Sequence, residues 1–136
     1  QKIKETLVNS DFNENNLVIN EKTQQISIID WGESVIAHPF FSIASHLQSI
    51  ARRYKLELKG VFLGKIKQHC LSCWSDIADM DELEMIYQNI LRVHPIFCAL
   101  AIHRLQAATA NKSKELQNWF VAGFLRMLLK NEDARS

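Results

Sequence analysis

The alternation of apolar and polar positions changes once along this chain, near residue 38. Before that point, two short apolar runs rich in β-branched residues occupy 16–20 and 25–30, and the polar sequence EKTQ separates them. Two such runs with a short polar connection predict a β-hairpin. Afterwards, apolar residues recur every three or four positions, which predicts helices. The expected fold class is therefore α+β, mainly helical, in a single unit without repeats or linkers.

Helix-start and helix-stop residues divide the second part into about five helices. Pro39 lies where the first helix should begin, Asp79 and Glu82 have the spacing of a capping box, and Pro95 should end a helix. The predicted helices are 38–54, 61–78, 79–94, 96–109 and 112–130.

The composition is that of an ordinary globular protein. The chain has 136 residues, 47% hydrophobic and 23% charged, with a formal net charge of +1. This charge does not favour nucleic acid or an anionic membrane as a partner, and no apolar run reaches the roughly 18 residues of a membrane helix. Three cysteines suit a reducing, cytoplasmic setting.

Two further features concern zinc and the start of the chain. His69, Cys70 and Cys73 form half of a zinc pattern, but a second pair is missing, so we interpret them as residues of a buried helix. The chain starts with Gln1 and its first segment has no helix cap. We therefore expect it to be part of a longer protein.

Side-chain oxygens gather in residues 10–20, SDFNENNLVIN. A calcium loop would need oxygens at its positions 1, 3 and 5, Gly at 6 and Glu at 12. Asp11, Asn13 and Asn15 satisfy the first three, but Asn16 replaces the glycine and Lys22 the glutamate. A cation in place of a bidentate carboxylate argues against calcium.

A phosphoryl-transfer site is a second interpretation of the same residues. Kinase sites pair an Asp with an Asn after four intervening residues, and add a second Asp that follows a strand and precedes a Gly. Asp11, Asn16 and Asp30 have this order, and a hairpin would return Asp30 to the other two. Alternatively, Asp11 and the asparagines only form turns, and Asp30 caps a strand.

At these residues the chain resembles the C-terminal lobe of the aminoglycoside phosphotransferase and choline kinase family, which has a protein-kinase-like fold. The family's catalytic loop, His-Gly-Asp followed by four residues and Asn, corresponds to NSDFNENN, and its Ile-Asp-Trp/Phe-Gly motif to IIDWG. ESVIAHPFFSIASHL stands where the family has Asp-Pro and a helix with Asp-Leu-Ala. The resemblance is motif-specific over 9–47 and architectural over the remainder.

The resemblance implies an enzyme that transfers the γ-phosphate of ATP to a hydroxyl of a small molecule. Asp11 would be the catalytic base, and Asn16 and Asp30 would hold Mg²⁺ and, through it, ATP. Residues 1–136 would form one C-terminal lobe, with the catalytic loop, hairpin and metal-binding loop in 1–37 and a helical subdomain in 38–136. The N-terminal nucleotide lobe of the family is absent from this chain, which alone should be inactive.

Three positions depart from the family pattern. The family's histidine two residues before the catalytic Asp, which braces the metal-binding segment, is Asn9 here. The Asp before the proline is His38, and the Asp of Asp-Leu-Ala is Ser42. We expect the last two to serve helix capping and loop bracing.

The residues leave more than one acceptor and more than one activity open. Clustered acids could attract a polycationic aminoglycoside or a quaternary amine, or only solvate a helix N-terminus; they are Asp76, Asp79, Asp81, Glu82 and Glu84. Choline would want an aromatic cage, for which the chain offers Trp31, Trp74, Tyr54 and Tyr87. The other functions considered are a non-catalytic, pseudokinase-like binding module and a fragment that self-associates, for instance as a homodimer.

Overall fold

The structure is a computed structural model that describes residues 2–108 and 120–128. The chain divides into two compact units, Gln1–Tyr87 and Gln88–Ser136. Helix α3 (Met80–Ala108) contributes its first residues to one unit and the remainder to the other. Helices and two small antiparallel sheets together confirm an α+β, mainly helical fold.

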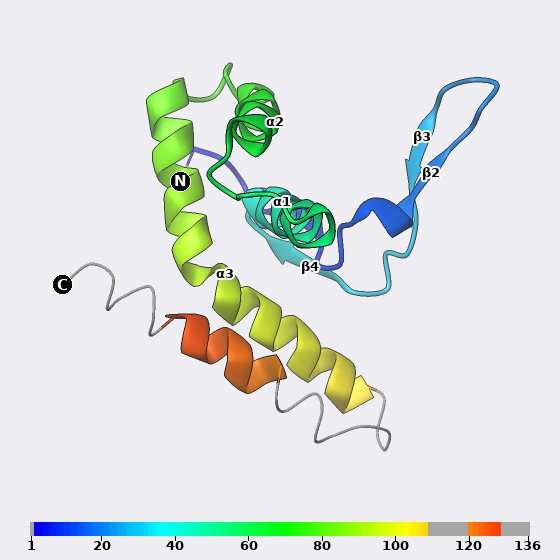
Figure 1. Ribbon diagram of the computed structural model, residues 1–136, viewed down its shortest axis with the longest axis vertical. Coiled ribbons are helices and arrows are strands. Elements are labelled where there is room, and N and C mark those ends of the chain that lie inside the picture. The colour runs from blue at the N-terminus through cyan, green and yellow to red at the C-terminus, as the bar shows by residue number, and fades with distance from the viewer. Residues whose placement is uncertain (1, 109–119, 129–136) are drawn as a thin grey trace. The chain divides into compact units, whose positions relative to one another are not determined.

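The first unit contains every strand that the structure describes (Figure 1). Strand β1 (Thr6–Asn9) pairs with β4 (Ser34–Ala37), and β2 (Leu17–Ile19) pairs with β3 (Ile26–Ile28). A short 3₁₀ helix, η1 (Glu14–Asn16), precedes β2 directly. Helices α1 (Phe40–Tyr54) and α2 (Val61–Ser72) follow the strands, before α3 begins.

The predicted hairpin is confirmed as β2 and β3. Leu17 lies opposite Ile28 and Ile19 opposite Ile26. The side chain of Asn20 shapes the connection, because its Oδ1 accepts hydrogen bonds from the backbone N–H groups of Lys22 and Thr23 at 3.0 and 3.2 Å.

The β1–β4 pair was not predicted. Each strand has only four residues, and the segment between them holds the hairpin, so neither carries a local turn that would mark its partner. The pairing sets Asn9 opposite Ser34. It therefore joins the start of the predicted catalytic loop to the chain just after the Asp30 motif.

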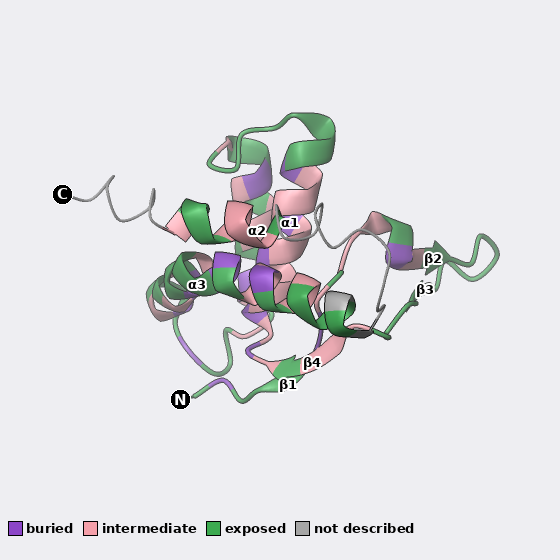
Figure 2. Cartoon of the chain, turned by 90° about the horizontal axis from the view of Figure 1, so that it is seen from below, coloured by how far each residue is buried: buried purple, intermediate pink, exposed green. Residues whose placement is uncertain are grey.

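Helix α1 supplies the centre of the core in the first unit. Phe40, Ala44, Leu47 and Ala51 are buried at intervals of three or four residues. Phe40 is fully buried and its ring lies edge-on to that of Trp74, with centroids 5.2 Å apart. Figure 2 shows buried positions on the helices, whereas the β2–β3 hairpin is largely exposed. The core is completed by Ile3, Val8, Leu63, Leu71, Ala78, Leu83 and Tyr87.

One helix ends well before its predicted boundary. Helix α2 ends at Ser72 rather than at 78, because the backbone then turns with hydrogen bonds three residues apart, from Trp74 N–H to the Leu71 carbonyl and from Ser75 N–H to that of Ser72. Residues 120–128 are helical as predicted; the remainder of the predicted helix 112–130 lies outside the described residues.

The prediction that Pro95 separates two helices is wrong. Helix α3 continues through this residue, from Met80 to Ala108. Proline removes one N–H donor from a helix, but the surrounding turns can keep the helix continuous at a cost in free energy. Pro95 is buried, and the packing of its ring offsets part of that cost.

The continuous helix α3 is longer than the helices predicted on either side of Pro95. Over Met80–Leu105, 26 residues, α3 is long and apolar enough to cross a membrane by length and composition, a test that core helices of soluble proteins also pass. The sequence pattern did not indicate such a length because it was divided at Pro95.

Candidate functional site

Asp11 and Asn16 lie at the two ends of the loop that connects β1 to β2. The buried Asn16 side chain donates through Nδ2 to the Asp11 carbonyl at 2.9 Å and to the Asp11 carboxylate Oδ2 at 3.2 Å. Asp11 itself is exposed. The amide oxygen of Asn16 accepts no hydrogen bond from residues 2–108, so this loop presents one carboxylate and one available amide oxygen together.

The Asn9 side chain connects this loop to Asp30. Asn9 is only 3% exposed. Its Oδ1 accepts from the backbone N–H of Asp11 at 2.9 Å, and its Nδ2 donates to the carbonyl of Asp30 at 3.0 Å. A single planar amide thus fixes the start of the predicted catalytic loop against the predicted metal-binding segment. The bracing role that the resemblance assigned to this position is compatible with asparagine, despite its shorter side chain.

Asp30 adopts a backbone conformation that few residues other than glycine tolerate. Its φ angle is 56°, in the left-handed region, and Asp is among the residues that enter this region with less strain than most. The preceding N–H, from Ile29, donates to the carbonyl of Asn16 at 2.9 Å. Backbone hydrogen bonds therefore bring the Asp30 segment to the Asn16 end of the loop, and the Asp30 side chain is exposed.

Ser42 and His38 support the same region from the start of α1. The Ser42 hydroxyl lies 3.5 Å from the carbonyl of Asn9, a long and weak hydrogen bond. His38 accepts through Nδ1 from the backbone N–H of Phe40 at 3.2 Å. These contacts are the loop bracing and helix capping expected of the two residues. Because His38 is buried, its pKa is lowered from the ordinary value.

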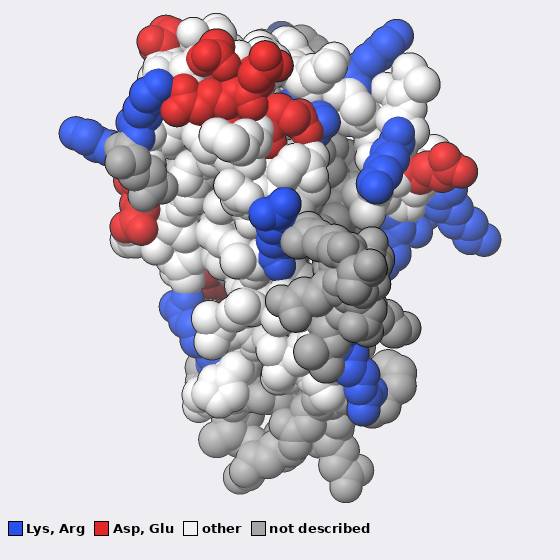
Figure 3. Space-filling model, turned by 90° about the vertical axis from the view of Figure 1, so that its left-hand side faces the viewer, with Lys and Arg blue, Asp and Glu red and all other residues white. Residues whose placement is uncertain are grey.

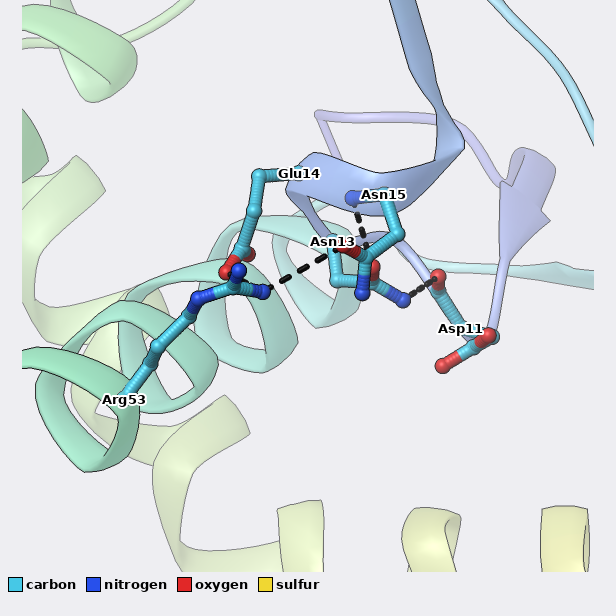
Figure 4. A network of polar contacts seen from close by, with 5 residues as sticks. All are labelled: Asp11, Asn13, Glu14, Asn15 and Arg53. Atoms are coloured by element: carbon cyan, nitrogen blue, oxygen red, sulfur yellow. Dashed lines mark hydrogen bonds and ion pairs between the residues drawn. The ribbon is translucent and has the colours of Figure 1, made fainter.

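The remaining asparagines of the loop hold its turn. Figure 4 shows Asn13 donating through Nδ2 to the Asp11 carbonyl at 2.8 Å and accepting through Oδ1 from the N–H of Asn15 at 2.9 Å. Asn15 in turn accepts from Arg53, which also lies 2.7 Å from Glu14. The sequence did not predict the pair of Glu14 and Arg53, because residues so distant in the chain leave no local pattern.

The acidic residues at 76–84 cap the start of α3 and form ion pairs with lysines. In Figure 3, acidic side chains gather at the top of the face shown, the end at which α3 begins in Figure 1. Asp79 Oδ1 accepts from the N–H of Glu82 at 2.8 Å, which is half of the predicted capping box. Lys2 pairs with Glu82 at 2.6 Å, and Lys67 pairs with Glu84 at 2.7 Å. These contacts agree with the solvated helix start rather than an acceptor pocket.

Asp11, Asn16 and Asp30 carry the kind of side-chain oxygen that magnesium prefers. Mg²⁺ prefers oxygen ligands and is commonly held by one or two carboxylates together with substrate phosphates and water. In the described part of the chain, no three His, Cys, Asp or Glu side chains gather as a metal site. A metal held by Asp11, Asn16 and Asp30 would therefore depend on two carboxylates and one amide. Cys73 is exposed, contrary to the expectation of buried cysteines.

Comparisons with known proteins add no assignment. The chain matches no family model, no curated protein and no solved structure.

Proposed function

We propose that this chain is the acceptor and metal-binding lobe of an ATP-dependent phosphotransferase that phosphorylates a hydroxyl of a small molecule. The observation that carries the proposal is the Asn9 amide, which binds the Asp11 N–H and the Asp30 carbonyl at once. A buried side chain that binds both segments holds them at a fixed relative position, which a site shared by the two segments requires. The type of reaction, transfer of a phosphate to a hydroxyl, is inferred from the resemblance to the aminoglycoside phosphotransferase and choline kinase family.

In this proposal each residue of the site has one task. Asp11 orients the acceptor hydroxyl and accepts its proton. Asn16 and Asp30 provide an amide and a carboxylate oxygen for Mg²⁺, which supplies charge neutralisation at the phosphates when bound. Asn9 keeps the base and the metal ligand in register. A nucleotide-binding lobe from further polypeptide would complete the site, in a cytoplasmic protein.

Metal binding tests the proposal on this chain itself. Mn²⁺ replaces Mg²⁺ at such sites and broadens the NMR signals of nearby nuclei. Titration with Mn²⁺ should broaden the backbone signals of Asp11, Asn16 and Asp30 first, and Asp30→Asn should weaken binding by at least about 10-fold. Asp76→Asn, outside the site, is the matched control and should bind as wild type. Broadening confined to the Asp76–Glu84 region would contradict the proposed site.

Transfer tests the catalytic role, in this chain together with the nucleotide-binding lobe that the proposal requires. Asp11→Ala removes the proton acceptor and should reduce ADP release with an alcohol acceptor by about 10²-fold or more, while circular dichroism shows an unchanged fold. Turnover near that of wild type would exclude Asp11 as the base.

A binding module without catalysis is the second candidate. Asn9, His38 and Ser42 favour it, because they replace the family's histidine and two aspartates at these positions. This module would show Mn²⁺ and nucleotide binding but no ADP release with any acceptor in a panel of alcohols. Self-association as a homodimer is a further possibility that light scattering would detect.

A further inference from the structure

Glu14 lies two residues before the predicted magnesium ligand Asn16, and its side chain, 26% exposed, points toward Arg53. Both of its oxygens are shielded from solvent, and neither accepts a hydrogen bond of good geometry from the described residues. Its charge partner is Arg53, whose Nη1 lies 2.7 Å from Oε1. A shielded carboxylate is costly without a cation beside it. Glu14 therefore keeps its place only while Arg53 is present.

Arg53 contacts the η1 turn a second time. Its guanidinium donates from Nη1 to Oδ1 of Asn15 at 3.3 Å, across 38 residues of sequence (Figure 4). Arg53 belongs to the last turn of α1, a helix anchored in the core by Phe40, Ala44, Leu47 and Ala51. Two adjacent residues of η1 are thus attached to a rigid element of the same unit.

The residue that follows these two is Asn16. Its Nδ2 reaches the carbonyl and the carboxylate of Asp11, and its backbone carbonyl accepts from Ile29. A 3₁₀ turn of three residues cannot move Glu14 and Asn15 without moving Asn16 as well. The contacts form a continuous path from α1 to the amide oxygen that the site offers to a metal.

We propose that Arg53 is a positioning residue that sets the affinity of the site for a divalent cation, by holding the η1 turn through Glu14 and Asn15. The inference rests on the proposed function, since it assumes that Asn16 is a metal ligand. Arg53 touches neither metal nor substrate; it acts through the turn. Without it, the Glu14 carboxylate turns outward to water and the Asn16 amide loses its fixed orientation.

Four variants of this chain isolate the effect. Arg53→Gln removes the charge, and Arg53→Lys keeps the charge but replaces the planar guanidinium by an ammonium on a flexible stem. Arg52→Gln, an exposed neighbour in the same helical turn, is the control for lost charge. The double variant Glu14→Gln with Arg53→Gln removes both charges, so that no unpaired carboxylate remains.

Two readouts are measured on each variant. The first is the Mn²⁺ dissociation constant from electron paramagnetic resonance. We expect Arg53→Gln to weaken binding about 10-fold, Arg53→Lys and the double variant to recover part of the loss, and Arg52→Gln to bind as wild type. The second is the side-chain NMR signal of Asn16 in metal-free protein, which should shift and broaden in Arg53→Gln alone among the single arginine-to-glutamine variants.

The outcomes separate this inference from the proposed function. If the wild-type chain binds Mn²⁺ and Arg53→Gln binds it equally well, the positioning role is overturned and the proposed function stands. If the wild-type chain binds no Mn²⁺, the proposed function fails, and an Asn16 signal unchanged in metal-free Arg53→Gln overturns the positioning role as well. Equal losses in Arg52→Gln and Arg53→Gln would reduce the effect to general charge and also overturn it.

Discussion

At the scale of the residue, two asparagines hold the segments of the candidate site together. Asn9 and Asn16 are both buried, and each uses its amide to connect segments that the chain separates. An amide suits this task because it donates and accepts in one plane without carrying a charge into the interior. The sequence identified Asn16 by its spacing from Asp11. It did not identify the contacts of Asn9, because a hydrogen bond to a backbone carbonyl 21 residues away leaves no local pattern.

Asn9→Ala should destabilise the protein by about 2 kcal/mol, because a backbone N–H and a carbonyl lose their partners. Asn9→Asp is the sharper comparison: its carboxylate can still accept from the Asp11 N–H, but it repels the Asp30 carbonyl. Urea unfolding measures both variants. Wild-type stability of Asn9→Asp would show that the contact with Asp30 contributes nothing.

Two substitutions of Asp30 should differ in stability but agree in the loss of metal binding. Because its φ angle is 56°, Asp30→Gly should be more stable than Asp30→Ala by about 1 kcal/mol, while both lose the carboxylate and with it the affinity for Mn²⁺. Thermal unfolding and the Mn²⁺ titration together test this. If Asp30→Ala proved the more stable of the two, the backbone strain would be refuted.

At the scale of the element, the sequence predicted the strands and helices that depend on neighbouring residues. The hairpin β2–β3 and helix α1 follow from β-branched runs, a polar turn and a proline at a helix start. The β1–β4 pair and the continuity of α3 depend on partners far along the chain, or on packing that outweighs the preference of a single proline. Within α1, the buried positions are Phe40, Ala44, Leu47 and Ala51, at the spacing of three or four residues that predicts a helix.

Pro95→Ala should stabilise α3. Proline in a helix interior costs about 3 kcal/mol relative to alanine, and alanine restores an N–H that can donate to the carbonyl of Leu91. The smaller side chain forfeits roughly two buried CH₂ groups, at about 0.8 kcal/mol each. We therefore expect a net gain of about 1 kcal/mol in urea unfolding. A loss of stability would mean that the ring of Pro95 packs more favourably than its burial indicates.

At the scale of the whole molecule, one buried histidine should make stability depend on pH. His94, in the second unit, is 2% exposed, and burial lowers its pKa to about 4. Above the unfolded pKa of about 6.5, both states are neutral and the contribution is complete. As the pH falls from there toward 4, only the unfolded state takes up the proton, so stability decreases by about 1.4 kcal/mol per pH unit.

This dependence is measured by urea unfolding at pH 7 and pH 5. The wild-type protein should lose about 2 kcal/mol more than His94→Leu, which cannot titrate at this position. Equal losses in the two proteins would assign the acid sensitivity to other groups, such as His38, whose pKa is also lowered by burial.

The exposed two-stranded ribbon formed by β2 and β3 should unfold locally before the helices do. A ribbon of two short strands is marginal by itself in water, and most of its apolar side chains face solvent, including Val18, Ile19, Ile26 and Ile28. Its amide hydrogens should exchange with deuterium long before those of α1. Since Asn16 and Asp30 flank the base of this ribbon, whatever binds between them should slow that exchange, and the degree of protection would report occupancy without any assay of turnover.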